Sequence, residues 1–477
     1  MSSAPSKNIV IVGGGITGLS AAFYLQKEIR ARKLPWKITL LESKQQLGGK
    51  IQTIVRDGYT MERGPDSFIS RKPSAAQLVR DVGLESDLVR NEAGQAYILR
   101  HGQLLPIPEG AVMGVPTEIK PFVTTSLLSP IGKMRAAADL LLPASKMLEE
   151  EDQSVGTFFR QRLGNEVVEN IIEPLLSGIY AGNIDQMSLM TTFPQFAQMG
   201  KEHRSLILGM KSSRPKKQTN QKPVGMFQTL KSGLSSLVHA LELQLTDVDV
   251  KKGISVEKIV RDRDQYTLSL QNGERLTADS VILTTPHGFT RKILGNPDFL
   301  NPLHDRPTSV ATAILAYPQD EITWDKEGTG FLVPRSEEGY SITACTWTNK
   351  KWPHTAPPGK TLLRCYVGRA GEEAIVDRND EDIVGAVIQD IKKLSTITGE
   401  PEFSYVTRWR RAMPQFVPGH KTWYSNVQKQ IRNQYPGLFL AGSSYAGSGI
   451  PDCIDQGKNA ITDVIDYVSS ISLSTAL

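Results

Sequence analysis

Two glycine-rich segments, near opposite ends of the chain, combine residue types and spacing that suit the binding of a dinucleotide. In the first, Gly13, Gly15 and Gly18 occupy the glycine positions of a GxGxxG turn that follows the apolar run 9–12. The first glycine permits the tight turn, the second lets the backbone approach a pyrophosphate, and the third allows close packing of helix on strand. Free N–H groups at the start of that helix would then face the phosphates.

An acidic residue at the end of a second apolar run extends this pattern. Glu42 follows the run 38–41, where a carboxylate can accept hydrogen bonds from a ribose hydroxyl. The elements that must position these groups are a buried strand over 8–14, a helix over 18–33 and a strand over 37–43. A GxGxxG motif alone is a weak indication, but its surroundings favour a dinucleotide-binding βαβ unit over an accidental glycine turn.

The second glycine-rich segment, 437–457, contains a predicted helix start. Pro451 suits the first turn of a helix, and Asp452 supplies an acidic side chain there. Such a helix would point the positive end of its dipole at a cofactor ring. An ordinary capped helix accounts for both residues but not for the glycine-rich loop before them. We therefore expect both ends of the chain to bind one cofactor.

Several residues between the two ends allow a structural and a functional interpretation. Lys50 follows two glycines and could neutralise a phosphate. Val256, taken by itself, would be interpreted as an ordinary residue of the hydrophobic core. Arg63 could hold a structural salt bridge or line a cofactor channel, and its residue type does not decide between them. His287 closes a strand and is more often a satisfied loop histidine. No histidine stands in a metal-ligand spacing, so we expect no metal site and name no general base.

Length, charge and cysteine content limit the class of protein. A chain of 477 residues is expected to form two or three domains. The net charge of +5 does not indicate nucleic-acid binding, although a local basic cavity could still accept an acidic substrate. The three cysteines are far apart, which suits a reducing compartment. The short polar N-terminus and the lack of long apolar runs predict a cytoplasmic protein without a signal peptide or spanning helix.

The rest of the chain divides into segments that differ in their patterns of apolar, basic and turn-forming residues. Prolines and glycines interrupt apolar stretches over 104–143, which predicts a lobe of short helices; a wall for an apolar ligand or a membrane contact is the alternative. The basic stretch 211–222 predicts a solvated loop, with a docking site for a partner as the alternative. The pair Asn272-Gly273 predicts a hairpin. The strands predicted over 309–317, 328–334, 341–348 and 361–367 form a separate mixed sheet, covered by a helix predicted over 380–397. Strands predicted near 402–411 and 437–442 lead back to the C-terminal glycine loop.

Six motifs carry a resemblance to a known family: GGGITGL at 13–19, LGGKI at 47–51, ERGPDSF at 62–68, EPLLSGIYAG at 173–182, ACTWTNKKWPH at 344–354 and GIPDCIDQGK at 449–458. On these motifs the chain resembles the soluble bacterial protoporphyrinogen and coproporphyrinogen oxidases of the flavin amine oxidase superfamily. The resemblance covers nearly the whole chain. Many flavoproteins share the first motif, whereas EPLLSGIYAG and GIPDCIDQGK are much more specific.

The resemblance implies an α/β fold with a Rossmann-type FAD-binding domain, a mixed-sheet substrate domain and a mainly helical lobe. The FAD-binding domain is expected to be discontinuous, over 1–57, 225–292 and 405–477. The substrate-binding domain would comprise 58–87, 184–224 and 293–404, and the helical lobe 88–183. The FAD itself would be bound non-covalently by Gly13, Gly14, Gly15, Ile16, Thr17, Gly18, Glu42, Ser43, Lys50, Gly64, Pro65, Asp66, Ser67, Val256, Trp409, Ile450, Pro451 and Asp452.

The activity that the resemblance implies is the six-electron oxidation of a porphyrinogen to a porphyrin in heme biosynthesis, with oxygen reoxidising the flavin to give hydrogen peroxide. Flavin N5 carries the hydride transfer, so no side chain is named as catalytic. Soluble Gram-positive-type members are associated with coproporphyrinogen III, whose four propionates require cations. We assign Arg71, Arg364 and Tyr366 to the substrate wall, with surface salt bridges as the alternative. Arg364 and Tyr366 share one face of their strand, and the other face looks like core.

Three rival functions stay open at this point. Protoporphyrinogen IX has the same ring with two propionates fewer, so an oxidase for that substrate is the first alternative. A flavin amine oxidase or carotenoid desaturase would use the same fold, and a non-catalytic binding protein of the escort type would be expected to lose cofactor-contacting residues that are present here. Transient contact with a ferrochelatase and peripheral contact with a membrane are also left open.

Overall fold

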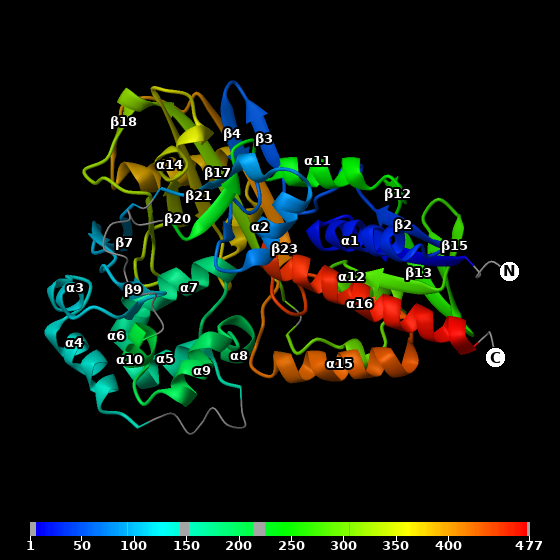
Figure 1. The fold of residues 1–477 in the computed structure, drawn as a ribbon. Coiled ribbons are helices and arrows are strands. Elements are labelled where there is room, and N and C mark those ends of the chain that lie inside the picture. Colours follow the sequence, from blue (N-terminus) through cyan, green and yellow to red (C-terminus); the bar gives the residue numbers. More distant parts are fainter. Residues whose placement is uncertain (1–5, 93, 144–151, 213–224, 305, 475–477) are drawn as a thin grey trace.

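The computed structural model describes residues 6–92, 94–143, 152–212, 225–304 and 306–474. These residues form a parallel sheet flanked by helices, a mixed sheet and a group of short helices, which occupy different regions of the molecule (Figure 1). The predicted α/β fold class is therefore confirmed.

A five-stranded parallel sheet gathers strands from distant parts of the chain. Its order is β12-β2-β1-β16-β24, formed by Val248–Lys252, Trp36–Glu42, Lys7–Val12, Ser280–Leu283 and Leu438–Leu440. The strands are rich in apolar residues because both faces of the sheet are covered. One face packs against α1 (Ile16–Arg32), α11 (Ser235–Gln244) and α16 (Ile450–Ser474). The other face packs against β13 (Val256–Asp262), β14 (Gln265–Leu270), β15 (Arg275–Ala278), α12 (His287–Ile293) and α15 (His420–Gln434).

The predicted βαβ unit and hairpin are present, with shifted ends. Strand β1 stops at Val12, two residues before the predicted end, because Gly13 turns the chain with a φ of +109°. Helix α1 begins at Ile16, before the predicted start at Gly18, since Gly15 already serves as its N-cap. The hairpin between β14 and β15 turns at Gly273, whose φ is +87°.

A seven-stranded mixed sheet forms a second layer. Its order is β23-β17-β21-β20-β19-β7-β8, formed by Phe403–Met413, Thr308–Pro318, Lys360–Val367, Ile342–Trp347, Gly330–Leu332, Ala96–Arg100 and Gln103–Pro106. Helix α14 (Asp380–Lys392) covers one face, and Asn379 caps its first turn. The predicted end of this helix at 397 is wrong, because Thr396–Ile397 form a short strand, β22, that pairs with β18 (Ile322–Thr323).

The short helices of the lobe share one apolar core. They are α3 (Ile119–Thr124), α4 (Pro130–Ala137), α5 (Val155–Leu163), α7 (Glu173–Tyr180), α8 (Leu189–Thr192), α9 (Pro194–Glu202) and α10 (Leu206–Ser212). A buried ion pair joins Arg162 of α5 to Asp139, with 2.6 Å between Nε and Oδ1. The same carboxylate accepts hydrogen bonds from the Ser205 hydroxyl and the Ile207 N–H. One polar group thus connects α5, α10 and the turn after α4.

The described elements cross two of the predicted domain boundaries. Within the range 88–183, assigned to a helical lobe, β7 and β8 extend the mixed sheet. Within the range 184–224, assigned to the substrate domain, α8, α9 and α10 pack in the core of the lobe. Strand pairing at the edge of the mixed sheet decides the first case, and packing in the apolar core of the lobe decides the second. The division into three domains stays a prediction.

Two further expectations concern the surface. The basic stretch 211–222 lies almost entirely outside the described residues, apart from Lys211 and Ser212 at the end of α10. The lobe exposes several large apolar side chains, namely Ile119, Ile131, Met134 and Leu141. None of the helices in the described ranges is both long and apolar enough to cross a bilayer.

The buried ion pair of the lobe gives a test of its stability. Replacing Arg162 by Met should lower the free energy of unfolding by about 3–5 kcal/mol, because Asp139 would remain buried without its partner. Arg160 is a matched control: it also lies on α5, but its ion pair with Asp185 is partly exposed, so Arg160→Met should cost about 0–1 kcal/mol. Urea unfolding followed by circular dichroism measures both, and equal losses would contradict the assignment.

Candidate cofactor and substrate site

The GxGxxG turn has the geometry of a phosphate cradle. A side chain at Gly13 would meet the Thr284 hydroxyl at 2.6 Å, and a side chain at Gly18 would collide with the Gly13 carbonyl. At Gly15, by contrast, a Cβ would meet nothing within 4 Å. Gly13 and Gly18 therefore permit close packing, whereas Gly15 faces open space. No acidic side chain occupies the first turn of α1, so an anion there would meet the positive end of the helix.

Glu42 connects the end of β2 to this turn. Its Oε2 accepts a hydrogen bond of 2.7 Å from the Gly14 N–H, and its Oε1 accepts one of 2.8 Å from the Lys44 N–H. The Ser43 hydroxyl also donates to Oε1, at 3.2 Å. A carboxylate has further lone pairs, so these bonds orient Glu42 and leave acceptor capacity for a ribose hydroxyl. The residues of the turn and the strand end thus fit the adenosine part of a dinucleotide.

Lys50 is half-buried next to the end of β23 and close to Cys453 of α16. Its ammonium donates a hydrogen bond to the Ala412 carbonyl, near the end of β23. Burial lowers the pKa of Lys50, while the neighbouring Cys453 acts in the opposite direction. The preceding Gly49, with a φ of +61°, lies against Gly15. The loop that carries Lys50 therefore covers the glycine turn, and the proposed contact with a phosphate stays a prediction.

The segment from Gly64 to Ser67 passes between the parallel sheet and the mixed sheet. At Gly64 a side chain would collide with the Lys50 carbonyl, and the Trp409 indole N–H donates a hydrogen bond of 3.0 Å to the Arg63 carbonyl. Arg63 itself donates from Nε to the Thr407 hydroxyl at 3.0 Å. These contacts fix the backbone of the segment from both sides. Pro65 continues this turn, and Val256 lies apart from it as a buried residue at the start of β13.

Asp66 is held by two nearby cations, Lys351 and Arg364. Lys351 Nζ lies 2.9 Å from Asp66 Oδ2, and the Ser67 hydroxyl donates to Oδ1 at 2.7 Å. Burial alone would raise the pKa of Asp66, but the charges of Lys351 and Arg364 outweigh it and hold that pKa well below its usual range. Asp66 is therefore a permanent anion. Lys351 could not be predicted as its partner, because the pairing depends on the approach of two segments that are distant in the chain.

Arg364 and Tyr366 share one face of β21, as predicted from the period of a strand. The opposite face, with Leu363, Cys365 and Val367, packs in the core beneath α14. The Arg364 guanidinium is 4% exposed, donates to the Gly64 carbonyl and lies 5.0 Å from the centre of the Tyr366 ring. Arg364 thus supports the Gly64 turn, and Arg71 is exposed at the surface. The assignment of these three residues to the substrate stays a prediction.

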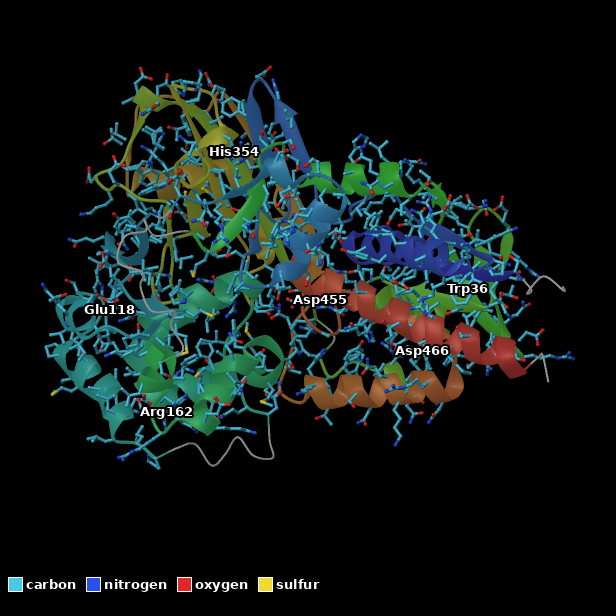
Figure 2. The ribbon with its side chains drawn as sticks, viewed as in Figure 1. Trp36, Glu118, Arg162, His354, Asp455 and Asp466 are labelled. Carbon is cyan, nitrogen blue, oxygen red and sulfur yellow. The ribbon has the colours of Figure 1, made fainter. Side chains whose placement is uncertain are left out.

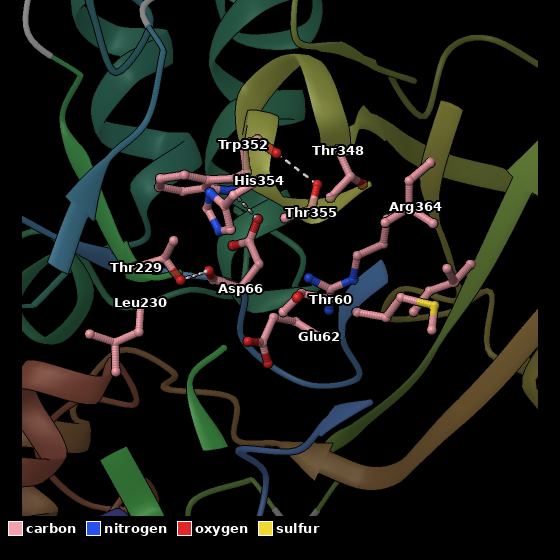
Figure 3. A pocket seen from close by; sticks show the side chains of 13 residues that line it. Thr60, Glu62, Asp66, Thr229, Leu230, Thr348, Trp352, His354, Thr355 and Arg364 are labelled. Atoms are coloured by element: carbon pink, nitrogen blue, oxygen red, sulfur yellow. Dashed lines mark hydrogen bonds between the residues drawn. The ribbon is translucent and has the colours of Figure 1, made fainter. Parts of the chain in front are cut away.

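A small pocket lies behind this segment (Figure 3). Glu62, Asp66, His354 and Arg364 line it together with several threonines. Burial raises the pKa of Glu62 to about 7, although the Leu234 N–H and the Thr53 hydroxyl donate hydrogen bonds to its carboxylate. The lining residues come from β4 (Tyr59–Glu62) and the loop after it, β11 (Phe227–Leu230), β17, the segment 348–355 and β21. Of the segment from Gly64 to Ser67, Asp66 lines this pocket, which was not predicted from the sequence.

The start of α16 lies at the middle of the molecule. Its Asp452 forms an ion pair with Lys72, and Asp455 accepts a hydrogen bond of 2.5 Å from the Ser74 hydroxyl at the start of α2 (Pro73–Asp81). Figure 2 shows Asp455 at this central end of the helix and Asp466 farther along it. Ile450 and Pro451 form the first turn, as predicted. Gln456, which sequence reasoning missed, accepts from the Gly442 N–H and donates to the Gly447 carbonyl.

The two ends of the chain meet at this point. A side chain at Gly457 of α16 would lie 2.7 Å from the Thr17 carbonyl of α1, and Gly442 also packs near Thr17. Helices α1 and α16 run side by side in Figure 1. Of the predicted cofactor residues, those of the glycine turn, the 47–51 loop and the start of α16 therefore lie together. Among the residues that the structure describes, no cluster of His, Cys, Asp and Glu has the makings of a metal site.

Comparison with known proteins places this geometry in a family. The family model of flavin-containing amine oxidoreductases matches residues 16–465. A coproporphyrinogen III oxidase from Bacillus subtilis is 53% identical over 97% of this chain and 99% of its own length. One from Staphylococcus aureus is 42% identical over 96% and 99% of the two chains. A chloroplastic protoporphyrinogen oxidase from Spinacia oleracea is 30% identical over 97% and 85%.

Solved structures agree with this relationship. A crystal structure assigned to a protoporphyrinogen oxidase from Exiguobacterium sp. 255-15 superposes with a TM-score of 0.86 at 41% identity, covering 98% of this chain and 99% of that one. Putrescine oxidase, at 14% identity and a TM-score of 0.68 over 97% and 100% of the two chains, shares the fold alone. The chain therefore belongs to the flavin-containing amine oxidoreductase family.

Proposed function

We propose that the protein is an FAD-dependent oxidase that converts coproporphyrinogen III to coproporphyrin III in heme biosynthesis and releases hydrogen peroxide. The observation that carries the proposal is the meeting of the glycine turn, the 47–51 loop and the start of α16 around one site. The 53% identity to a coproporphyrinogen III oxidase supports the choice of substrate. An escort protein that has lost its cofactor contacts would not need to keep the glycine turn, the 47–51 loop and the start of α16 together at one site.

FAD fits the residues present. The open space at Gly15 and the free end of α1 would take the pyrophosphate, and Glu42 would take the adenosine ribose. The start of α16 would stabilise negative charge on the flavin ring, because the positive end of the helix dipole points there. When bound, the flavin would supply the hydride-accepting chemistry. The protein's part is to hold the ring, exclude water and orient the porphyrinogen.

The substrate would meet cations next to this site. Arg71 and Lys72 follow the Gly64 turn, and Lys72 already forms an ion pair with Asp452. Lys351 and Arg364 are committed to Asp66 and to the Gly64 carbonyl, so they act as supports of the turn. Arg71 is exposed and is thus the cation best placed to bind a propionate directly. Tyr366 would contribute an aromatic surface on the same side of the sheet.

Two related functions are alternatives to this proposal, and the proposal also includes the cell compartment. An oxidase for protoporphyrinogen IX would use the same cofactor site and differ in the cations that it needs. A flavin amine oxidase shares the fold, but the specific motifs of the chain favour a porphyrinogen. We propose a cytoplasmic enzyme with oxygen as its second substrate. Contact with a ferrochelatase or a membrane surface would have to involve regions outside this site, such as the apolar side chains exposed on the lobe.

The choice of substrate can be tested directly. Purified protein should convert coproporphyrinogen III to a fluorescent porphyrin faster than it converts protoporphyrinogen IX, because the former has two more carboxylates for the cations to bind. Hydrogen peroxide should appear in parallel. Fluorescence with each substrate in air, and a peroxide assay, measure both. A preference for protoporphyrinogen IX would show that this compound is the substrate instead. If neither compound is oxidised, the amine oxidase and desaturase alternatives become the favoured ones again.

The role of Arg71 can be separated from a role in folding. Arg71→Ala should raise KM for coproporphyrinogen III about five- to tenfold with kcat little changed, since an exposed charge contact is worth about 1 kcal/mol. Arg80→Ala is the control, because Arg80 is also an exposed arginine and lies on α2, the helix that follows Arg71. Steady-state kinetics of both variants decide the matter. An unchanged KM in Arg71→Ala would remove Arg71 from the substrate wall.

We propose that the flavin is bound non-covalently, and the buried thiol of Cys453 supports this. This thiol is in the first turn of α16, and burial raises its pKa to about 11, so it is a poor nucleophile at neutral pH. Acid precipitation should therefore release yellow flavin into the supernatant. Cys453→Ser should retain the same amount of flavin as the unaltered protein. Flavin that stays in the pellet of the unaltered protein but not of the variant would show a covalent bond instead.

A further inference from the structure

Arg364 is a buried cation with one donor that lacks a partner. Its side chain is 4% exposed, so its charge lies away from bulk water. One terminal nitrogen, Nη2, donates a hydrogen bond to the Gly64 carbonyl. The buried Nε–H, by contrast, has no hydrogen-bond partner among the residues that the structure describes. Because an unpaired N–H on a buried guanidinium is costly, Nε requires an acceptor.

Two carboxylates lie close enough to interact with this charge but do not contact it. Burial raises the pKa of Glu62 and of Asp66, and the charge of Arg364 is among the influences that oppose the rise. Within the described ranges of the chain, however, no direct ion pair joins Arg364 to either carboxylate. A buried pair of charges is stable only when hydrogen bonds complete it. A polar group must therefore connect the guanidinium to one of them.

Glu62 is the carboxylate that can accept a further hydrogen bond. Asp66 already forms an ion pair with Lys351, at 2.9 Å from Oδ2. At Glu62, Oε1 accepts from the Leu234 N–H at 2.6 Å, while Oε2 shares the Thr53 hydroxyl with Oε1, each at 3.0 Å. A carboxylate oxygen has two lone pairs, so Oε2 has acceptor capacity to spare.

The cavity between these groups has room for one water molecule. Its volume is about 20 Å³, and a buried water needs roughly 10–15 Å³. Arg364, Glu62 and Thr60 line it, and Figure 3 shows the Arg364 side chain extending from β21 toward the other two. Thr60 and Glu62 lie on the same face of β4, since they are two residues apart in a strand. The walls thus offer one donor and two acceptors, and buried waters typically make about three hydrogen bonds.

We propose that this cavity binds one ordered water molecule, which accepts a hydrogen bond from Arg364 Nε and donates one to Glu62 Oε2. Its second hydrogen is donated to the Thr60 hydroxyl oxygen. The water makes Arg364 and Glu62 an ion pair that is bridged instead of direct. It would be needed whichever substrate the protein oxidises, because the burial of the guanidinium requires it.

The bridging water lets one guanidinium connect two parts of the chain. Nη2 of Arg364 stays on the Gly64 carbonyl, while Nε reaches β4 through the water. A water-mediated hydrogen bond is nearly as favourable in enthalpy as a direct one. The position of the Gly64 turn relative to β4 is therefore set in part by a molecule that is not encoded in the sequence.

Crystallography of the full-length protein, at a resolution that shows ordered water, tests the site directly. We expect one density peak in the cavity, within hydrogen-bond distance of both Arg364 Nε and the Glu62 carboxylate. A cavity without density, or an Arg364 side chain turned into direct contact with Glu62, would overturn the proposal. A peak with the anomalous scattering of a halide would also overturn it, because the site would then bind an anion.

Replacement of Glu62 tests the same water in solution. In Glu62→Leu the water loses its charged acceptor, so oxygen-17 relaxation dispersion of the solvent should detect one long-lived internal water fewer than in the unaltered protein. Glu62→Gln keeps a polar group of the same shape and should keep the number of long-lived waters unchanged.

Glu242→Leu is the matched control, because Glu242 is a partly exposed glutamate whose partner is Lys252 at the surface. It should leave the number of long-lived waters unchanged. An unchanged number in Glu62→Leu, or an equal loss in Glu242→Leu, would contradict the assignment. If Glu62→Leu does not fold, the crystal density of the unaltered protein decides by itself.

Discussion

The close approach of the first and last helices is the constraint on which the rest of the structure depends. Gly18 lets α1 lie against the Gly13 turn, and Gly457 lets α16 lie against Thr17. A side chain at Gly457 would push α16 away from α1, and one at Gly18 would collide with the Gly13 carbonyl and displace the glycine turn from α1. With these positions free of side chains, Asp452 and the loop before it come to the edge of the glycine turn. The mixed sheet and the lobe are attached to this frame at its central end.

A second principle is the use of buried charge to hold the Gly64 turn. Asp66 is paired with Lys351, and Arg364 supplies its guanidinium to the Gly64 carbonyl. Charges buried without partners are costly, so each of these groups depends on the others for its place. A turn fixed in this way cannot move without exposing an unpaired ion. The small pocket that contains Glu62 lies directly behind it, which concentrates polar groups where the two sheets meet.

Much of this could be predicted from the sequence, and the part that could not has one physical cause. Local patterns were sufficient for the βαβ unit, the hairpin at Gly273 and the two faces of β21, because strand and helix periods are properties of neighbouring residues. Contacts between distant segments carry no such pattern. The pairing of Asp66 with Lys351, the hold of Gln456 on its loop and the burial of Arg364 were therefore missed, and β7 was assigned to the wrong neighbours.

The strand order of the parallel sheet has a consequence for how the molecule is made. Strands β1 and β2 leave the ribosome first. Strands β12 and β16, which extend the sheet, begin only at Val248 and Ser280, after the helices of the lobe, and β24 begins at Leu438, after all the strands of the mixed sheet. Until then the first two strands expose an apolar edge, a situation that favours aggregation and calls for protection by chaperones. The contact between α16 and α1 can form only after this last helix has been synthesised.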